Sequence, residues 1–454
     1  PVDLGAVAGN YTGIDLTPPN IIYQPLLNSC TPGARTLVAT ITDVTGVPVS
    51  GVGLPVVYWS INAPAGPFTA AQMTHVSGNT YQETSIGTGS VVGDVIYYYI
   101  VAQDLTGTPL ISANPSLGAG SFTANPPAAG TPPSTPNSYT NVASLSGTYT
   151  VGTGGNYTTL TAAVADYNTK CLTGNVVFEL TTTYYNTSTG ETFPIVINQN
   201  PDAGPTKTLT IRPAAGTEVL MVASSGATAN ALIKLNGADY VTIDGDNTVD
   251  PDQKFLIYNT ATVAGHVAVW ISSLATGQGA TNNTIKNCQI NTGISQNTST
   301  VSSYGILMSG TTLSGTHASI TAGADNDNNT FSGNLIIRAR YGIYCIGASS
   351  ANPNTGTVIN NNTLGAETLN TGFQIGKAAI VVREEDGIQI TNNDIRNVGG
   401  SFANTPATSA DRVGIAFSSD GTWPATNVYV KNAVVTGNKI HQVVEERTFS
   451  AAAI

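Results

Sequence analysis

Charged residues are what this sequence has least of. Only 9% of its 454 residues are Asp, Glu, Lys or Arg, against about 25% in ordinary soluble domains. Hydrophobic residues still make up 41%, so a large core is available, and its surface must be covered mainly by uncharged Thr, Ser, Asn and Gly. This balance is typical of extracellular β-proteins and disfavours a cytosolic helical enzyme. The length allows two or three domains.

Basic residues and long apolar runs are also scarce. The 16 Lys and Arg residues, in a chain of net charge −11, form no basic patch, which excludes nucleic acid as a partner. No apolar run approaches the about 18 residues that a membrane span needs. The start, Pro1-Val-Asp-Leu4, has neither the charged nor the apolar part of a signal peptide. We therefore expect an N-terminus that is processed or cut from a longer chain.

Cysteine and histidine are rare, with four of each. The cysteines fit neither a zinc site nor a redox pair. Two alternatives stay open for Cys30, Cys171, Cys288 and Cys345: four small buried or free cysteines, or one disulfide, from Cys30 to a loop or from Cys288 to Cys345. No His-x-x-x-His, Gly-x-Ser-x-Gly or phosphate-binding glycine loop occurs. The sequence thus favours a protein without catalytic activity, although it does not rule out an enzyme.

Two short apolar phrases alternate in the last third of the chain. The first is Gly-Ile or Ala-Ile followed by apolar residues. Its isoleucines are Ile306, Ile343, Ile380 and Ile415, which are separated by 37, 37 and 35 residues. The other is rich in Asn and is spaced less evenly; it occurs at 282–290, 328–336, 359–364, 390–395 and 434–440. Alternating short strands with polar loops of varying length predict a solenoid.

The composition of these phrases favours a parallel β-helix. Each supplies a few apolar positions at period 2, enough for one strand of about four or five residues. Asn and Gly tolerate the left-handed backbone of a sharp corner, and Asn side chains can stack in ladders between coils. Leucine-rich repeats and β-propellers are disfavoured, because no fixed Leu spacing or blade signature appears.

The rest of the chain predicts an all-β protein of two folded parts. Residues 19–124 alternate like the strands of an immunoglobulin-like β-sandwich, with Trp59 as a core aromatic. Residues 1–18 form a leader or inter-domain segment, and 125–144 form a Pro-rich linker. The β-helix follows over 145–454, with a short helix over 161–168 that covers its first coil and has Thr158 or Thr159 as its N-terminal cap. The chain ends inside an apparent coil, so we expect the natural β-helix to continue.

Several segments resemble a known group of proteins. These are the run from Thr148 to Tyr167, the strands at 172–180 and 191–197, the segment 210–216, and Tyr97-Tyr-Tyr-Ile-Val-Ala-Gln-Asp104 in the sandwich. They resemble large surface proteins of the Bacteroidetes, which carry immunoglobulin-like modules and right-handed, pectate-lyase-like β-helices. The resemblance implies export by the type IX route and a cell-surface location. Such proteins include adhesins, filament components and carbohydrate-active enzymes, so the resemblance leaves the function open.

The best cluster for acid–base chemistry is the run Arg383, Glu384, Glu385 and Asp386. Polysaccharide lyases and hydrolases on β-helices need carboxylates and a basic residue on one face of adjacent coils. Arg338 and Arg340 lie one coil earlier and are expected to approach the cluster. The alternative interpretation is a solvated tight turn with local ion pairs.

The best cluster for a metal ion holds four carboxylates, on Asp244, Asp246, Asp250 and Asp252. Oxygen-rich loops of this kind suit Ca²⁺, the one cofactor that the sequence suggests. Their spacing departs from the usual calcium loop, and Asp-Gly at the end of a strand is also ordinary turn chemistry. Both interpretations therefore stay open.

Three aromatic residues are candidates for contact with a glycan: Tyr304, Tyr341 and Trp423. Tyr304 and Tyr341 hold matching positions in successive coils, so a structural stack between coils is the alternative. We expect a structural or adhesive cell-surface protein that binds other surface proteins, copies of itself or glycans. A secreted polysaccharide-active or glycan-binding β-helix protein is the second hypothesis.

Overall fold

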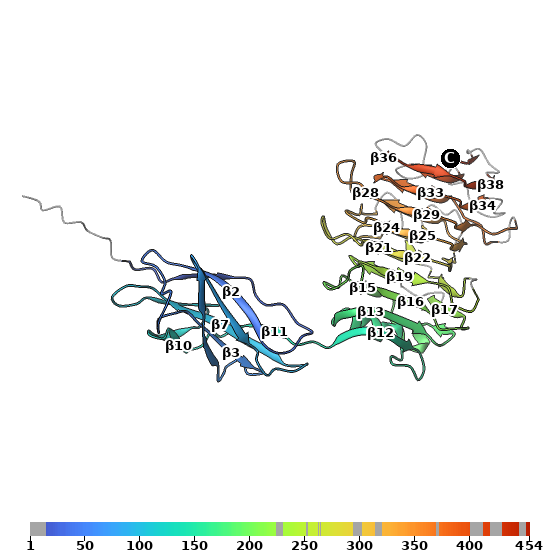
Figure 1. Cartoon of the computed structure of the whole chain (residues 1–454). Coiled ribbons are helices and arrows are strands. Elements are labelled where there is room, and N and C mark those ends of the chain that lie inside the picture. The colour runs from blue at the N-terminus through green and yellow to red at the C-terminus, as the bar shows by residue number, and fades with distance from the viewer. Residues whose placement is uncertain are drawn as a thin grey trace, which may run out of the picture. The chain divides into compact units, whose positions relative to one another are not determined.

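The protein consists of two compact units, Pro1–Ser144 and Leu145–Ile454, seen in a computed structural model. The structure describes residues 15–223, 230–250, 253–261, 263, 265–293, 302–313, 320–368, 372–399, 412–417, 429–444 and 451–454. Figure 1 shows crossing antiparallel strands in the first unit and stacked short strands in the second. The all-β class is confirmed, with one α-helix in the described part of the chain.

The first unit is an antiparallel β-sandwich. One sheet has the strand order β1 (Asn20–Tyr23), β2 (Arg35–Thr42), β6 (Thr80–Ile86), β5 (Thr74–Ser77). The other has the order β11 (Asn137–Thr140), β7 (Val95–Gln103), β3 (Val56–Ile61), β4 (Thr69–Gln72), with β8 (Ile111–Asn114) also on β7. The first unit is therefore a sandwich of two antiparallel sheets, with β4 and β5 as edge strands. Trp59 lies in the core between them, as predicted.

The predicted Pro-rich linker is wrong for most of its length. Residues 128–131 form β10 (Ala128–Thr131), which pairs with β9 (Gly120–Thr123). Further on, β11 pairs with β7 from Asn137↔Tyr98 to Thr140↔Val95. Tyr139 packs in the sandwich core and is only 2% exposed. The hairpin β9–β10 is thus an insertion between two strands, β8 and β11, that share the edge of β7.

The second unit is a parallel β-helix, as predicted. Its sheet I has the order β12 (Ser144–Val151), β13 (Cys171–Leu180), β16 (Leu209–Pro213), β19 (Val241–Asp244), β22 (Thr284–Lys286), β25 (Thr330–Ser332), β29 (Val358–Asn360), β33 (Gln389–Thr391), β37 (Val434–Thr436). Sheet II has the order β14 (Tyr184–Tyr185), β17 (Val219–Ala223), β20 (Phe255–Asn259), β23 (Cys288–Asn291), β26 (Leu335–Ile337), β30 (Thr363–Leu364), β34 (Asp394–Gly399), β38 (Lys439–Val444).

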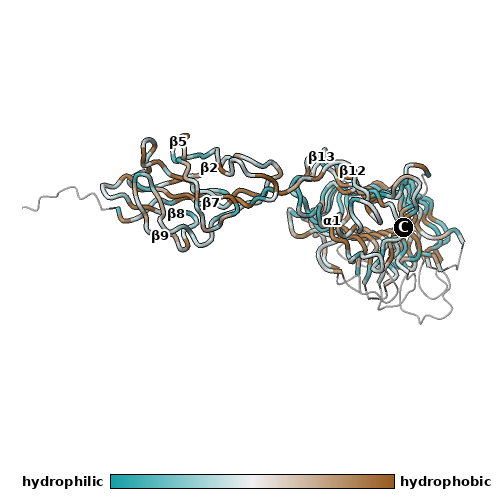
Figure 2. The backbone as a smooth tube through the Cα atoms, turned by 90° about the horizontal axis from the view of Figure 1, so that it is seen from below, coloured by the Kyte–Doolittle hydropathy of each residue, from teal (hydrophilic) through white to brown (hydrophobic). Residues whose placement is uncertain are grey.

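Sheet III has the order β15 (Ile195–Asn198), β18 (Ala231–Asn236), β21 (His266–Ser272), β24 (Ser303–Ser309), β27 (Tyr341–Ile346), β31 (Ala378–Arg383), β35 (Arg412–Phe417), β39 (Ala451–Ala452). A short sheet IV contains β28 (Asn354–Thr355), β32 (Glu385–Asp386) and β36 (Val430–Lys431). Figure 2 looks along the stacked coils, so that strands of successive coils superimpose around the apolar interior.

The pairing register confirms both repeated phrases. In sheet III, Ile306 pairs with Ile343, Ile343 with Ile380, and Ile380 with Ile415. In sheet II, Ile290 stacks on Ile336, which stacks on Leu364. All of these side chains lie in one buried core. The uneven spacing of the Asn phrase is absorbed by loops, because the register of the strands is kept.

The corner between sheets I and II explains the Asn-rich phrase. A residue with positive φ, either Asn or Gly, directly follows each of the last five strands of sheet I; these residues are Asn287, Gly333, Asn361, Asn392 and Gly437. The next residue in four of these corners is an Asn whose Oδ1 accepts the backbone N–H of the coil before at 3.0 Å; these are Asn334, Asn362, Asn393 and Asn438. We call these four residues the asparagine ladder.

The α-helix α1 spans Leu160–Tyr167. It therefore begins and ends one residue before the predicted range 161–168. The side chain of Thr159 accepts a hydrogen bond from the N–H of Ala162 and caps the helix. Glu191 adds two hydrogen bonds, from the N–H groups of Leu160 and Thr161 at 2.8 Å, which suits the positive end of a helix dipole. The apolar face of α1 belongs to the β-helix core, so the helix covers the first coil. The short 3-10 helix η1 (Thr187–Thr189) lies just before Glu191.

Candidate functional site

The Arg383–Asp386 run is neither a solvated turn nor an open acid–base site. Glu385 has no solvent exposure; its Oε1 accepts from Nδ2 of Asn354 at 3.0 Å and its Oε2 from the hydroxyl of Thr357 at 2.8 Å. Burial raises the pKa of Glu385 to about 8, against the lowering effect of these hydrogen bonds. The side chain is therefore a neutral internal acid at pH 7, placed by its pairing in sheet IV.

The other members of the run face different surroundings. Glu384 is 9% exposed and holds a positive φ of 52° at the corner before β32. Asp386 accepts a hydrogen bond from Asn432 at 2.7 Å on the next coil. Arg383 ends β31 and pairs with Ile346 in sheet III. The four side chains thus do not converge on one substrate site.

The predicted approach of Arg338 and Arg340 to this run is wrong. Arg340 immediately precedes Tyr341, which pairs with Ala378 at the start of β31. Arg383 lies at the other end of β31, five residues on, which corresponds to about 17 Å along a strand. The basic residues and the acidic run therefore lie at opposite ends of the same strand pair.

The predicted calcium loop does not gather its carboxylates. Asp244 pairs with Nζ of Lys286 at 3.0 Å, and Asp250 pairs with Lys254 at 2.8 Å. Asp246 accepts the N–H of Thr248 at 2.7 Å in a local turn. Asp252 lies outside the described residues. Among the residues described, Asp244, Asp246 and Asp250 form no group that could share one cation, which favours the turn interpretation.

Tyr304 and Tyr341 cannot contact a glycan here, because both are fully buried. Their rings are 5.2 Å apart with an interplanar angle of 11°, which is the stack between coils that we considered as the alternative. Tyr344 packs edge-on against both. Leu313 and Ile320 belong to the same apolar cluster on the outer face of sheet III. Trp423, the third candidate, lies outside the described residues.

Cys288 and Cys345 are free thiols in the structure. Cys288 and Cys345 are buried in sheets II and III, so the predicted disulfide between them is not formed. Burial raises the pKa of both thiols well above its usual value. These two cysteines are therefore small apolar core residues with no nucleophilic character.

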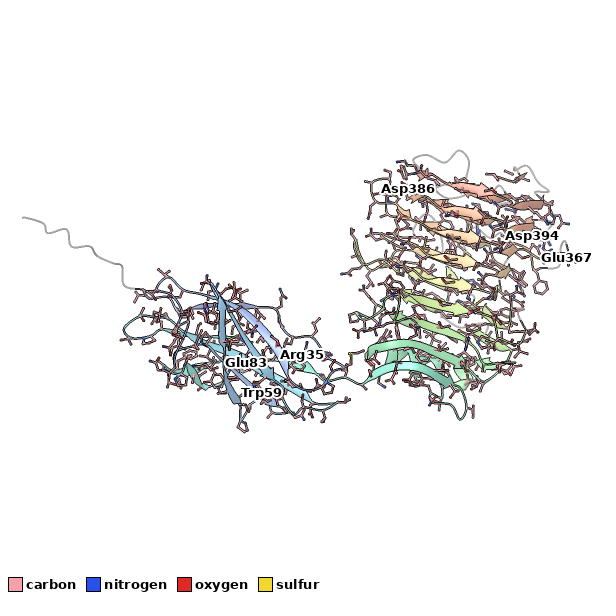
Figure 3. The ribbon with its side chains drawn as sticks, viewed as in Figure 1. Arg35, Trp59, Glu83, Glu367, Asp386 and Asp394 are labelled. Carbon is pink, nitrogen blue, oxygen red and sulfur yellow. The ribbon has the colours of Figure 1, made fainter. Side chains whose placement is uncertain are left out.

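A groove lies on the outer face of sheet II in the β-helix. It has a volume of about 540 Å³ and is lined by Tyr258, Gln289, Asn291, Leu335, Ile337, Gly365, Ala366, Glu367, Phe373 and Arg396. Tyr258, Gln289 and Leu335 come from successive strands β20, β23 and β26. Phe373 is 42% exposed and, with Glu367, comes from the loop between β30 and β31. Figure 3 shows Glu367 and Asp394 on one flank of the β-helix and Asp386 on the other.

The chemistry of this groove suits binding better than hydrolysis. Tyr258 and Phe373 offer aromatic surface, and Gln289 donates a hydrogen bond to the Tyr258 hydroxyl. Arg396 supplies a cation and is 3.6 Å from Asp394. Glu367 is the one carboxylate among the described lining residues, whereas glycoside hydrolysis needs two. Sequence analysis missed this groove, because its residues share a face only once the coil register is known.

Comparison with known families agrees with the fold. Residues 146–369 match a family model described as "Protein of unknown function (DUF1565)", a family associated with parallel β-helix proteins. The matched range begins in β12 and lies within the second unit. No curated protein matches the chain. None of the helices in the described part of the chain is both long and apolar enough to cross a membrane.

Proposed function

We propose that this protein is an extracellular structural or adhesive component of a bacterial cell surface. Its partners are other surface proteins or copies of itself. Because its sequence resembles surface proteins of the Bacteroidetes, we also propose that the protein comes from this group and is exported by the type IX route. The match to a β-helix family and the low charge support the same class of protein.

The continuity of the β-helix is the observation that carries the proposal. Sheet I runs through nine strands in the described chain, which at about 4.8 Å per strand corresponds to a rod of about 38 Å. The asparagine ladder ties consecutive coils together from within. Side chains that could act in catalysis, such as Glu385, are buried inside the coil. These features favour a stiff spacer over an enzyme.

Electron microscopy of the native cell surface tests the proposal. Antibodies against the sandwich, carrying gold particles, should label fibres or long rods at a regular repeat, and cells without the gene should lack both. Isolated short particles with no assembly would refute the structural function. In cells whose type IX route is disabled, the protein should disappear from the surface; unchanged surface labelling would refute that route.

The groove on sheet II supports a second candidate function, glycan binding. Aromatic surface beside a cation and one carboxylate is the kind of mixed lining that orients a sugar. A glycan array with the purified chain tests it. Phe373→Ala should lose the signal, whereas Val434→Ala, which removes a 47% exposed side chain from sheet I, should keep it. Equal signals from the two variants, or no bound glycan, would refute this function.

A further inference from the structure

Three Asp-x-Thr segments meet at one end of the β-sandwich. Asp15 precedes β1, Asp43 follows β2, and Asp104 follows β7. Since Asn20 at the start of β1 pairs with Thr42 at the end of β2, the antiparallel topology brings Asp15 beside Asp43. One side-chain oxygen from each of the three carboxylates lies within 4.8 Å of the other two. The cluster therefore draws on both sheets and on the segment before the first strand.

Each of the three carboxylates is held through its Oδ1 atom. The Oδ1 atom accepts the N–H and the hydroxyl of the Thr two residues later, at 3.0 and 2.7 Å for Asp15, 2.8 and 2.8 Å for Asp43, and 3.2 and 2.7 Å for Asp104. Leu110 donates a third hydrogen bond to Oδ1 of Asp104 at 2.9 Å. These bonds orient the three carboxylates through their Oδ1 atoms, and the side chains of Thr45 and Asp43 also interact with the Asp15 carboxylate.

Asp104 is the member of the cluster that points most clearly to a ligand. Its side chain is completely buried, and its Oδ2 atom has no hydrogen-bond partner. The Oδ2 atom of Asp15 is also buried and unpartnered. In the described part of the sandwich, no Lys or Arg forms an ion pair with any of the three carboxylates.

We propose that Asp15, Asp43 and Asp104 bind a calcium ion. A buried carboxylate oxygen without a partner is costly unless a cation or donor meets it. Ca²⁺ takes oxygen ligands at about 2.3–2.6 Å, so two ligands on one ion lie at most about 5 Å apart, and the observed separation fits. The donors are all carboxylates, without the His or Cys that zinc and copper sites favour. Backbone carbonyls and water complete such shells.

The ion would fasten the segment 15–17 to the ends of β2 and β7. Because β2 and β7 belong to different sheets, bound Ca²⁺ would also tie the two sheets together at this end. The loops that follow β2 and β7 would then open less often. This proposal is independent of the groove and of the proposed surface function, since it concerns only the first unit.

Hydrogen exchange of the full-length chain tests the site. After treatment with a chelator, Ca²⁺ is added to about 100 times its dissociation constant, and exchange is followed in the segments 43–48 and 104–110. Opening of these segments should slow by up to about 100-fold, and equilibrium dialysis should show the bound Ca²⁺. Mg²⁺ at the same concentration should slow exchange much less, because it demands a smaller octahedral shell.

Two variants and a matched control decide the outcome. Asp104→Asn and Asp15→Asn should each remove the slowing and lower the calcium stoichiometry by one. Asp94→Asn, which alters a sandwich aspartate that accepts from Asn62 and Val91, should keep both. If Asp104→Asn fails to fold, Asp15→Asn decides alone, because Asp15 lies outside the strands. Unchanged exchange of the wild type with Ca²⁺, full slowing in Asp15→Asn, or equal slowing by Mg²⁺ would overturn the proposal.

Discussion

Glu385→Gln should remove a pH dependence from the stability of the β-helix. Glu385 is fully buried, and its oxygens accept hydrogen bonds from Asn354 and Thr357. Burial raises its pKa in the folded protein to about 8, from the usual value of 4.5. A Gln side chain has the same shape. Its amide oxygen can accept from Asn354, and its N–H can donate to the Thr357 hydroxyl, so the neutral contacts survive.

The sign follows from the raised pKa. Between about pH 4.5 and 8 the folded state keeps a proton on Glu385 that the unfolded state has released, so stability falls as pH rises through this window. The contribution of the protonated Glu385 side chain to stability is complete below about pH 4.5 and is lost as the pH rises through about 8. A shift from 4.5 to about 8 corresponds to about 5 kcal/mol at about 1.4 kcal/mol per unit, which is the upper limit.

Urea unfolding of wild type and Glu385→Gln from pH 4 to pH 9 measures this effect. The two proteins should be about equally stable near pH 4.5, and the variant should become more stable than the wild type by several kcal/mol near pH 8.5. Asp386→Asn, one residue further along β32, serves as the control and should follow the wild type. A constant difference between Glu385→Gln and wild type across this range would refute the buried, protonated state of Glu385.

Three further predictions concern the same unit. Asn393→Ala should destabilise it by about 2–5 kcal/mol in urea unfolding, because the N–H of Asn362 loses its acceptor and buried groups are left unsatisfied; Asn392→Gly, at a positive φ of 56°, should change stability by less than about 1 kcal/mol. Thr159→Ala should cost about 1 kcal/mol by removing the cap of α1, and a change below about 0.3 kcal/mol would contradict that role. Gly245→Ala should prevent soluble expression, since its Cβ would collide with the carbonyl oxygen of Asn287, whereas Gly204→Ala meets nothing within 4 Å and should express normally.

The fold could be predicted where the sequence repeats. Matching positions such as Ile343 and Ile380 are paired in the structure, because a coil that must bury its apolar face fixes the register of the next. The stretch 125–144 could not be predicted in the same way. Its prolines indicate an extended linker, yet Tyr139 fills the sandwich core and draws Asn137–Thr140 onto β7. Four residues carry too little local signal to outweigh such composition, so the tertiary contact decides.

The candidate sites failed for a different physical reason. Both interpretations of Arg383–Asp386 assumed that a run of charges faces solvent, but sheet IV turns Glu385 inward, and burial then neutralises it. The carboxylates of the acidic loop at 244–252 are close together in sequence but not in space. Asp244 pairs with Lys286, and Asp250 pairs with Lys254.

The carboxylates that do converge are Asp15, Asp43 and Asp104, which are far apart in the chain and share only the pattern Asp-x-Thr. That pattern was the available signal, because a Thr that holds one carboxylate oxygen fixes the direction of the other. A buried acid needs a proton, a hydrogen-bond donor or a cation beside each oxygen. Burial gives Glu385 a proton, and the open Oδ2 of Asp104 leaves a place for a cation.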